Sequence, residues 1–144
     1  MWQYRGFQFP QDLGILIRVV YLTFFYTLLL NRKSFQQVLE RLPQGCQKTN
    51  AEHAVDQQDY IMLDKIWRGT SFVLCHILRT DKPCLRRTLV LYHWFCSSNH
   101  NIKASVGVCK ENNMLRSHAW LIINGVPFRE NHAELEKYSP IIEW

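Results

Sequence analysis

The sequence predicts an α+β fold, with helices first and a small antiparallel sheet after them. Apolar residues recur at helical spacing as far as about Cys96. After Asn101 the period changes to two, and the sequence "NG" at Asn124-Gly125 then marks a tight hairpin turn. The expected architecture is therefore a set of N-terminal helices and a central helix packed on a small antiparallel sheet.

Length and composition indicate one globular domain. The chain has 144 residues, of which 47% are hydrophobic and 20% charged, so it can bury a core. We divide it into an N-terminal helical region, residues 1–50, and a core, residues 51–144, within one compact domain. The formal charge of +5 is spread over singletons and short doublets without interleaved aromatics, so we expect no nucleic-acid partner.

The first helix is expected to open at Pro10 and Asp12 and to run to about Leu30. Its apolar stretch from Leu13 to Leu30 is interrupted only by Arg18, and eighteen residues are the lower limit for a membrane span. An arginine in mid-span is costly in lipid. The apolar surface continues nearly all round, so we expect packing on more than one side, within protein or against a membrane face, with a span as the alternative. No signal peptide is predicted, because a basic start and a cleavage site are missing.

Three further helices follow. Ser34 and Gln37 form a capping-box pattern that predicts a short second helix, which Pro43 then ends. Helical spacing returns over residues 51–78, where Gly69 is expected to mark a kink or a break. The next helix should start at Pro83, because proline suits the first helical position, and should end near Cys96.

The C-terminal part predicts strands. Alternation marks a half-buried strand over residues 102–108, "KENNMLR" is expected to be a loop, and "SHAWLII" a second strand. "VPFRE" should return as a third strand at a sheet edge, because Pro127 cannot donate to a ladder. The tail is expected to contain a helical turn or two and an apolar end.

The five cysteines, Cys46, Cys75, Cys84, Cys96 and Cys109, are an odd number. An odd number without a signal peptide favours reduced thiols and a cytoplasmic protein, with membrane association as a variant. Their spacing fits no closed zinc site, so we expect neither a metal nor another cofactor. We expect Cys75, Cys96 and Cys109 to be small buried hydrophobic side chains.

Cys84 has a different setting. It occupies the first turn of a predicted helix, where free N–H groups and the helix dipole favour the thiolate. His118 lies downstream on a predicted strand. A cysteine at a helix start with a histidine on an adjoining strand is one arrangement for nucleophilic catalysis, whereas a lone histidine on a strand is more often structural.

Three segments, "CLRRTLVLY", "IKASVGV" and "HAWLIINGVPFRE", resemble the leader peptidases of lasso-peptide biosynthesis, whose fold is transglutaminase-like. The resemblance covers about Cys84 to Glu130. It implies that Cys84 is the nucleophile, His118 the general base and later acid, and Glu130 the acid that orients the imidazole. The sequence departs from the family pattern at Glu130, where Asp is usual, at Thr88, where Ser is usual, and at Ile122, where an acid often stands.

Strand register leaves the acid open. A strict two-residue turn at Asn124-Gly125 pairs His118 with Asn131 and puts Glu130 on the other face. A one-residue bulge near Pro127 would bring Glu130 to His118. The Asn131 amide is the alternative partner, and the Cys84 backbone N–H is a candidate oxyanion donor.

The leading functional hypothesis is a cysteine peptidase that removes the leader from a ribosomally made precursor. The resemblance implies the split form, which works with the precursor leader peptide, a separate leader-recognition protein and an ATP-dependent macrolactam synthetase. The first helix and "KENNMLR" are expected contact surfaces for such partners. The alternatives are acyl transfer to an amine by the same triad and a non-catalytic interaction module.

Overall fold

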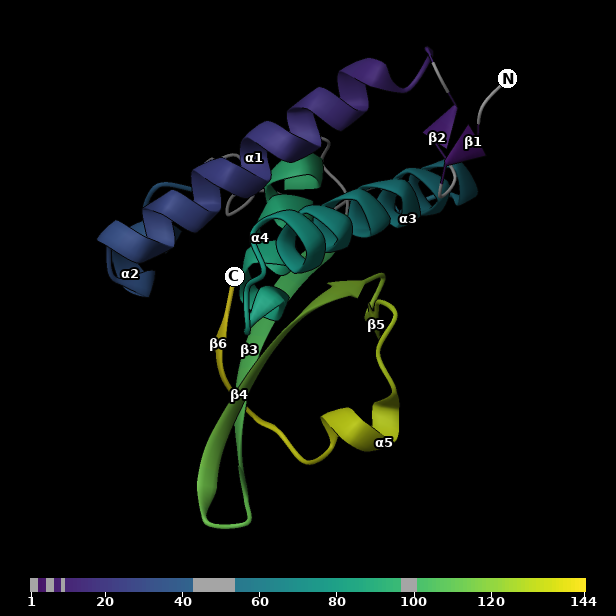
Figure 1. Ribbon diagram of the computed structural model, residues 1–144. Helices are drawn as coiled ribbons and strands as arrows, with labels where there is room; N and C mark the ends of the chain where they lie inside the picture. The colour runs from purple at the N-terminus through teal and green to yellow at the C-terminus, as the bar shows by residue number, and fades with distance from the viewer. Residues whose placement is uncertain (1–2, 5–6, 9, 43–53, 97–100) are drawn as a thin grey trace.

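The computed structural model confirms the α+β fold (Figure 1) and describes residues 3–4, 7–8, 10–42, 54–96 and 101–144. The helices are α1 (Leu13–Arg32), α2 (Phe35–Leu39), α3 (Gln57–Phe72), the π-helical turn η2 (Val73–Ile77), α4 (Pro83–Cys96) and α5 (His132–Leu135). The strands are β1 (Gln3–Tyr4), β2 (Phe7–Gln8), β3 (Ile102–Glu111), β4 (Met114–Ile123), β5 (Val126–Pro127) and β6 (Ser139–Glu143).

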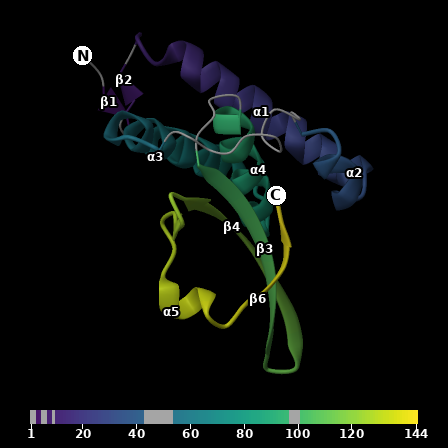
Figure 2. The same cartoon turned by 180° about the vertical axis from the view of Figure 1, so that it is seen from behind.

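Helix α4 lies at the centre of the fold. It contacts α1 and α3 on one side and strands β3 and β4 on the other, as both views of the ribbon show (Figures 1 and 2). A helix clamped in this way must be apolar on opposite faces. This explains the unbroken buried run Leu89, Val90, Leu91 and Tyr92. The core closes around it with Val19 and Tyr26 of α1, Leu63 and Ile66 of α3, and Leu121 and Ile123 of β4.

Helix α1 buries one face only. Val19, Leu22, Thr23 and Tyr26 are buried. Exposed large apolar side chains line the rest of the helix: Leu13, Ile17, Tyr21, Phe24, Phe25 and Leu28. Within the described chain the helix packs on one side, and packing of its other faces against a partner or a membrane stays a prediction. By length and composition alone, α1 could cross a membrane.

The helix ends follow local capping chemistry. Ser34 and Gln37 form the predicted capping box at the start of α2, and Asp56 and Asp59 form another at the start of α3. The chain does not break at Gly69, because α3 continues to Phe72 and the irregular turn is η2, whereas a kink there stays a prediction. The tight packing of α3 against α1 and α4 overrides the glycine's weak helix propensity.

The four-stranded sheet has the order β5-β4-β3-β6 and is antiparallel throughout. The predicted "KENNMLR" loop is wrong. Strands β3 and β4 continue to Glu111 and Met114, and Asn112 and Asn113 form the connection with positive φ angles of 51° and 61°. Asparagine tolerates this conformation, which matches the twist of a hairpin. The resulting long hairpin extends beyond the helices (Figure 1).

The two edge strands of the sheet, β5 and β6, test the sequence predictions for this region. Pro127 does lie on an edge strand, as predicted. The sequence predicts only an apolar end for the tail, yet the tail forms strand β6 against β3, with a register shift between Val106 and Gly107. A five-residue strand that contains a proline carries too weak a local signal to be identified without its partner.

The cysteine predictions fail in part. Cys96 is buried, as predicted, but it is disulfide-bonded, so the odd number of cysteines does not indicate that every thiol is reduced. Cys75 is exposed and Cys109 half-buried, and both are free, as is Cys84. Cys46 lies outside the described residues.

Candidate active site

Cys84 lies in the first turn of α4, directly after Pro83, and is half-buried. Burial raises the pKa of its thiol. Hydrogen bonds from His118 and from the backbone N–H groups of Ala119 and Leu85 act in the opposite direction, and the net pKa is lowered. The helix start thus contributes one donor and the sheet two, so the site favours the thiolate.

His118 stands between the sulfur and a carboxylate. Its Nε2 lies 3.1 Å from Oε2 of Glu130. Hydrogen bonds to Cys84 and to Glu130 outweigh burial and raise the pKa of His118 to about 9. The same contact lowers the pKa of the Cys84 thiol, so thiolate and imidazolium stabilise each other, and the raised pKa of His118 keeps the imidazole protonated at neutral pH. The three residues predicted from the sequence therefore meet at one place.

The route by which Glu130 reaches His118 differs from both sequence alternatives. β5 keeps the strict register, with Ile123 opposite Val126, and the Phe128 N–H still donates to the Leu121 carbonyl at 2.8 Å. The expected bulge near Pro127 is therefore wrong. The chain leaves the ladder one residue later, at Arg129, whose φ is +55°.

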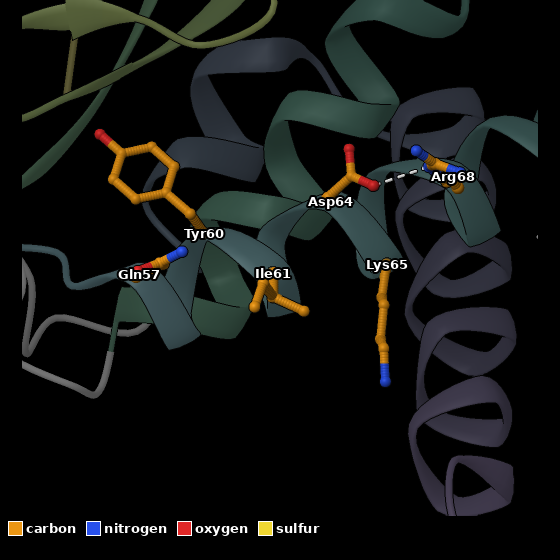
Figure 3. A pocket seen from close by; sticks show the side chains of 6 residues that line it. All are labelled: Gln57, Tyr60, Ile61, Asp64, Lys65 and Arg68. Atoms are coloured by element: carbon orange, nitrogen blue, oxygen red, sulfur yellow. Dashed lines mark ion pairs between the residues drawn. The ribbon is translucent and has the colours of Figure 1, made fainter. Parts of the chain in front are cut away.

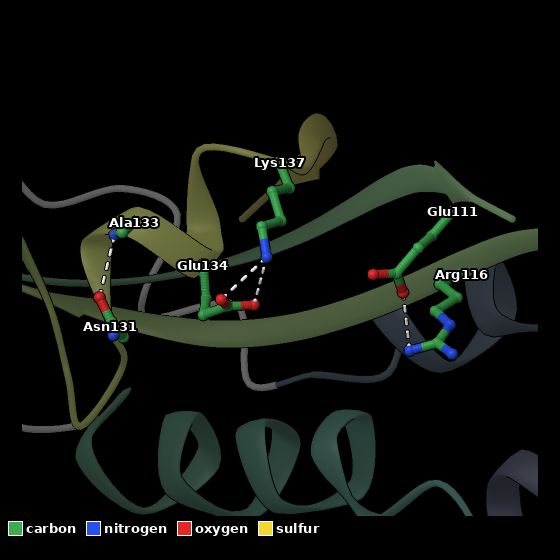
Figure 4. Close-up of polar contacts among 6 residues, drawn as sticks. All are labelled: Glu111, Arg116, Asn131, Ala133, Glu134 and Lys137. Atoms are coloured by element: carbon green, nitrogen blue, oxygen red, sulfur yellow. Dashed lines mark hydrogen bonds and ion pairs between the residues drawn. The ribbon is translucent and has the colours of Figure 1, made fainter.

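Asn131, the alternative partner, has another role. Its side-chain oxygen accepts a hydrogen bond from the Ala133 N–H at 3.0 Å and caps α5 (Figure 4). A capping oxygen used in this way satisfies a helix donor that would otherwise be unpaired. Glu130 is therefore the side chain that contacts the imidazole.

Arg129 is held in its positive-φ conformation by α3. Its guanidinium pairs with Asp64 and lies over the ring of Trp67, 4.2 Å from the centroid. Positive φ is unfavourable for a residue with a Cβ, so it persists only where surrounding contacts stabilise it. Arg87 covers the same indole ring at 4.6 Å. Sequence analysis missed this cluster, because nothing in the spacing of Asp64 and Trp67 connects them with the hairpin.

The contact between Ala119 and the sulfur follows from the end of the β4–β5 ladder. The Leu121 carbonyl faces β5, so the N–H groups of alternate residues, including Ala119, face the same side. β5 pairs with β4 only at Ile122 and Ile123. The Ala119 N–H is thus left at an edge, where it donates to Cys84.

Two aromatic side chains fix the other side of the imidazole. The centroids of Trp120 and Tyr138 lie 6.0 Å and 5.6 Å from that of His118. Gly107 is paired with His118 across the sheet, and a Cβ at Gly107 would lie 2.8 Å from the Trp120 ring and 3.0 Å from Cβ of Tyr138. The glycine in "SVGV" therefore makes room for the rings that pack beside His118.

Two hollows on the surface are lined by residues other than Cys84, His118 and Glu130. One, of about 350 Å³, lies on the outer face of α3 and is lined by Gln57, Tyr60, Ile61, Asp64, Lys65 and Arg68 (Figure 3). The other, of about 190 Å³, lies between the β3–β4 hairpin and α5 and contains the Glu111–Arg116 and Glu134–Lys137 ion pairs (Figure 4). Within the described ranges, no three or more His, Cys, Asp or Glu side chains are arranged so that they could hold a metal ion.

A cysteine at a helix start that is hydrogen-bonded to a histidine on a strand is an arrangement for nucleophilic catalysis by a thiolate. The sequence matches the transglutaminase-like superfamily over residues 25–143, which covers most of the chain and includes Cys84, His118 and Glu130. The chain belongs to the transglutaminase-like superfamily, which includes cysteine peptidases and related acyltransferases. A search of curated proteins and a search of solved structures each returned no match.

Proposed function

We propose that this protein is a cysteine peptidase that removes the leader from a ribosomally made lasso-peptide precursor. The contact that carries the proposal is the continuous series from Cys84 through His118 to Glu130, in which the thiol pKa is lowered and the imidazole pKa raised. The resemblance of "CLRRTLVLY" and "HAWLIINGVPFRE" to the lasso-peptide leader peptidases supports the substrate class.

In the proposed reaction, the Cys84 thiolate attacks the carbonyl carbon of the scissile bond. The His118 imidazolium gives its proton to the leaving nitrogen, the C–N bond breaks, and the core peptide departs with a free amine. The leader remains as a thioester on Cys84. His118 then takes a proton from water, whose oxygen attacks the thioester carbon. The C–S bond breaks, the Cys84 thiolate is restored beside the protonated His118, and the leader leaves as a free acid.

The charge states favour this order of events. At neutral pH the imidazolium is already protonated, so the proton needed by the leaving amine is in place before the attack. Glu130 stabilises that imidazolium and holds its ring. This contact supports a catalytic role for Glu130 in the place where Asp is usual.

The proposed partners are the precursor leader, a separate leader-recognition protein and an ATP-dependent macrolactam synthetase. The exposed apolar side chains of α1 are a candidate surface for such a protein or for a membrane. We retain the cytoplasm, with or without membrane association, as the proposed location.

The test combines the protein with precursor and recognition protein and follows the products by mass spectrometry. Cys84→Ala should abolish leader release, whereas Cys75→Ala, which removes an exposed free thiol, should leave it unchanged. Leader release by Cys84→Ala would refute the proposal. An amide in place of a free acid on the leader would show acyl transfer instead of hydrolysis.

A further inference from the structure

We infer that the exposed edge of β4 binds an extended segment of the peptide substrate as an added strand, through the backbone groups of Leu115 and Ser117. This inference rests on the proposed peptidase function and adds how the substrate is recognised. The occupant is a stretch of peptide in extended conformation, recognised by its main chain and leading to Cys84.

The direction of the backbone groups is fixed by the sheet register. The β3–β4 pairing runs without a shift from Ile102 opposite Ile123 to Glu111 opposite Met114. The Leu121 carbonyl points to the β5 side, so the N–H and C=O groups of Ser117 and Leu115 point the same way. β5 ends its pairing at Ile122, so these groups lie beyond its reach.

The two outer edges of the β3–β4 hairpin differ in how far neighbouring strands cover them. The outer edge of β3 is covered by β6, which pairs with it from Ser105 to Val108. The outer edge of β4 has β5 as its partner among the described strands, and Met114 to Ser117 are all exposed. Proteins normally protect long free edges, because such edges pair readily with other extended chains.

The free edge leads into the active site. The Ala119 N–H, next along the edge after Ser117, donates to the Cys84 sulfur. The sulfur thus stands where the partner of Ala119 would lie if the ladder continued. A strand added at Leu115 and Ser117 would carry its backbone toward that sulfur, which is the requirement for attack on a peptide carbonyl.

The chemistry of this edge defines the class of ligand. Main-chain hydrogen bonds supply affinity in strand addition and are independent of sequence, while alternate side chains meet opposite faces. Here one face carries Leu115, which is 75% exposed, and the other Arg116, paired with Glu111. The bound segment should therefore be unstructured when free, with selectivity set by alternate positions.

The test uses a probe that needs no knowledge of the precursor. Acetyl-tetra-alanine chloromethyl ketone alkylates a thiolate, since sulfur displaces chloride from the methylene carbon. Chloroacetamide does the same without a peptide. The labelling ratio is the rate of the tetrapeptide probe at Cys84 divided by the rate of chloroacetamide at Cys84. Mass spectrometry resolves Cys84 from Cys75 and Cys109. The ratio measures recognition of the peptide backbone separately from thiolate reactivity.

Ser117→Pro removes an N–H that faces the free edge and leaves the β3–β4 ladder intact. Its matched control is Lys110→Pro on the opposite edge of the same hairpin, beyond the end of β6. We expect Ser117→Pro to lower the ratio by about fivefold or more, the equivalent of roughly one lost hydrogen bond. Lys110→Pro should leave the ratio unchanged.

Equal ratios for Ser117→Pro and the wild-type protein would overturn the inference. A second measurement does not depend on the variant. It is needed if Ser117→Pro disturbs the site and so lowers the rate of chloroacetamide labelling. In the wild-type protein, amide hydrogen exchange at Leu115 and Ser117 should slow after labelling with the tetrapeptide probe and not after labelling with chloroacetamide. Equal exchange in both adducts would likewise overturn strand addition.

The outcome is separable from that of the proposed function. If the ratio and exchange behave as expected but no leader is released, the edge binds extended peptide and the leader-peptidase proposal fails. If leader is released but the ratio is insensitive to Ser117→Pro, the peptidase stands and strand addition fails.

Discussion

Replacing Glu130 by Gln should lower the pKa of His118 from about 9 to about 8. The amide oxygen can still accept the hydrogen bond from Nε2, now 3.1 Å from the carboxylate, but the negative charge is lost. A hydrogen bond to a charged group contributes about 1.5–3 kcal/mol, and one pKa unit corresponds to about 1.36 kcal/mol. His118 and Glu130 retain side-chain exposures of 23% and 21%, so solvent weakens the pair and the lower end of that range applies.

The sign follows from the charges. Glu130 favours the protonated imidazole, so its neutralisation must lower the pH at which His118 loses its proton. At pH 7 most of His118 remains protonated in the variant, whereas near pH 8.5 it does not. The loss of peptide cleavage should therefore appear on the alkaline side of the pH profile.

The assay is an NMR titration of the His118 ring, which requires no substrate. Glu134→Gln is the matched control. Glu134 lies on α5, and its carboxylate forms an exposed ion pair with Lys137. We expect the midpoint to fall by about one unit in Glu130→Gln and to stay in place in Glu134→Gln. An unchanged midpoint in Glu130→Gln would refute the role assigned to this carboxylate.

Three further predictions concern the surrounding structure. Arg129→Ala deletes the pair with Asp64 but keeps a Cβ at positive φ, so it should lower the His118 titration midpoint. Arg129→Gly should restore part of the midpoint. Wild-type midpoints in both variants would contradict the role of Asp64 and Trp67 in holding Arg129. Gly107→Ala should destabilise the fold by about 1–3 kcal/mol in urea unfolding, because its Cβ meets the Trp120 ring; an unchanged unfolding midpoint would show that the ring shifts without cost. Ser34→Ala should cost about 1 kcal/mol of thermal stability and Ser34→Asp much less, whereas equal losses would show that the capping oxygen is unimportant.

Much of the secondary structure could be predicted because its causes are local. Pro83 starts α4, the capping box at Ser34 starts α2, and Asn124-Gly125 turns the chain between β4 and β5. Each depends on residues within a few positions of one another. Local signals were insufficient where packing decides, as in the continuous α3 through Gly69 and in strand β6.

The residues of the candidate site also differ in whether their causes are local. A cysteine in a helix's first turn and a histidine on a strand were recognisable from residue type and position. The identity of the acid was not, because a strict hairpin register puts Glu130 on the wrong face. Its contact with His118 depends on Arg129, whose conformation is stabilised by Asp64 and Trp67 from a helix more than sixty residues earlier.

By itself, the sequence determined the succession of helices followed by a hairpin, the helix start at Cys84 and the strand that carries His118, since hydrophobic period and capping act over a few residues. Tertiary structure alone decided that β5 leaves the ladder after Phe128, that Glu130 meets the imidazole, and that the Ala119 N–H is left for the sulfur. These contacts join α3, α4 and the sheet, and a short-range pattern contains no information about which distant elements will meet.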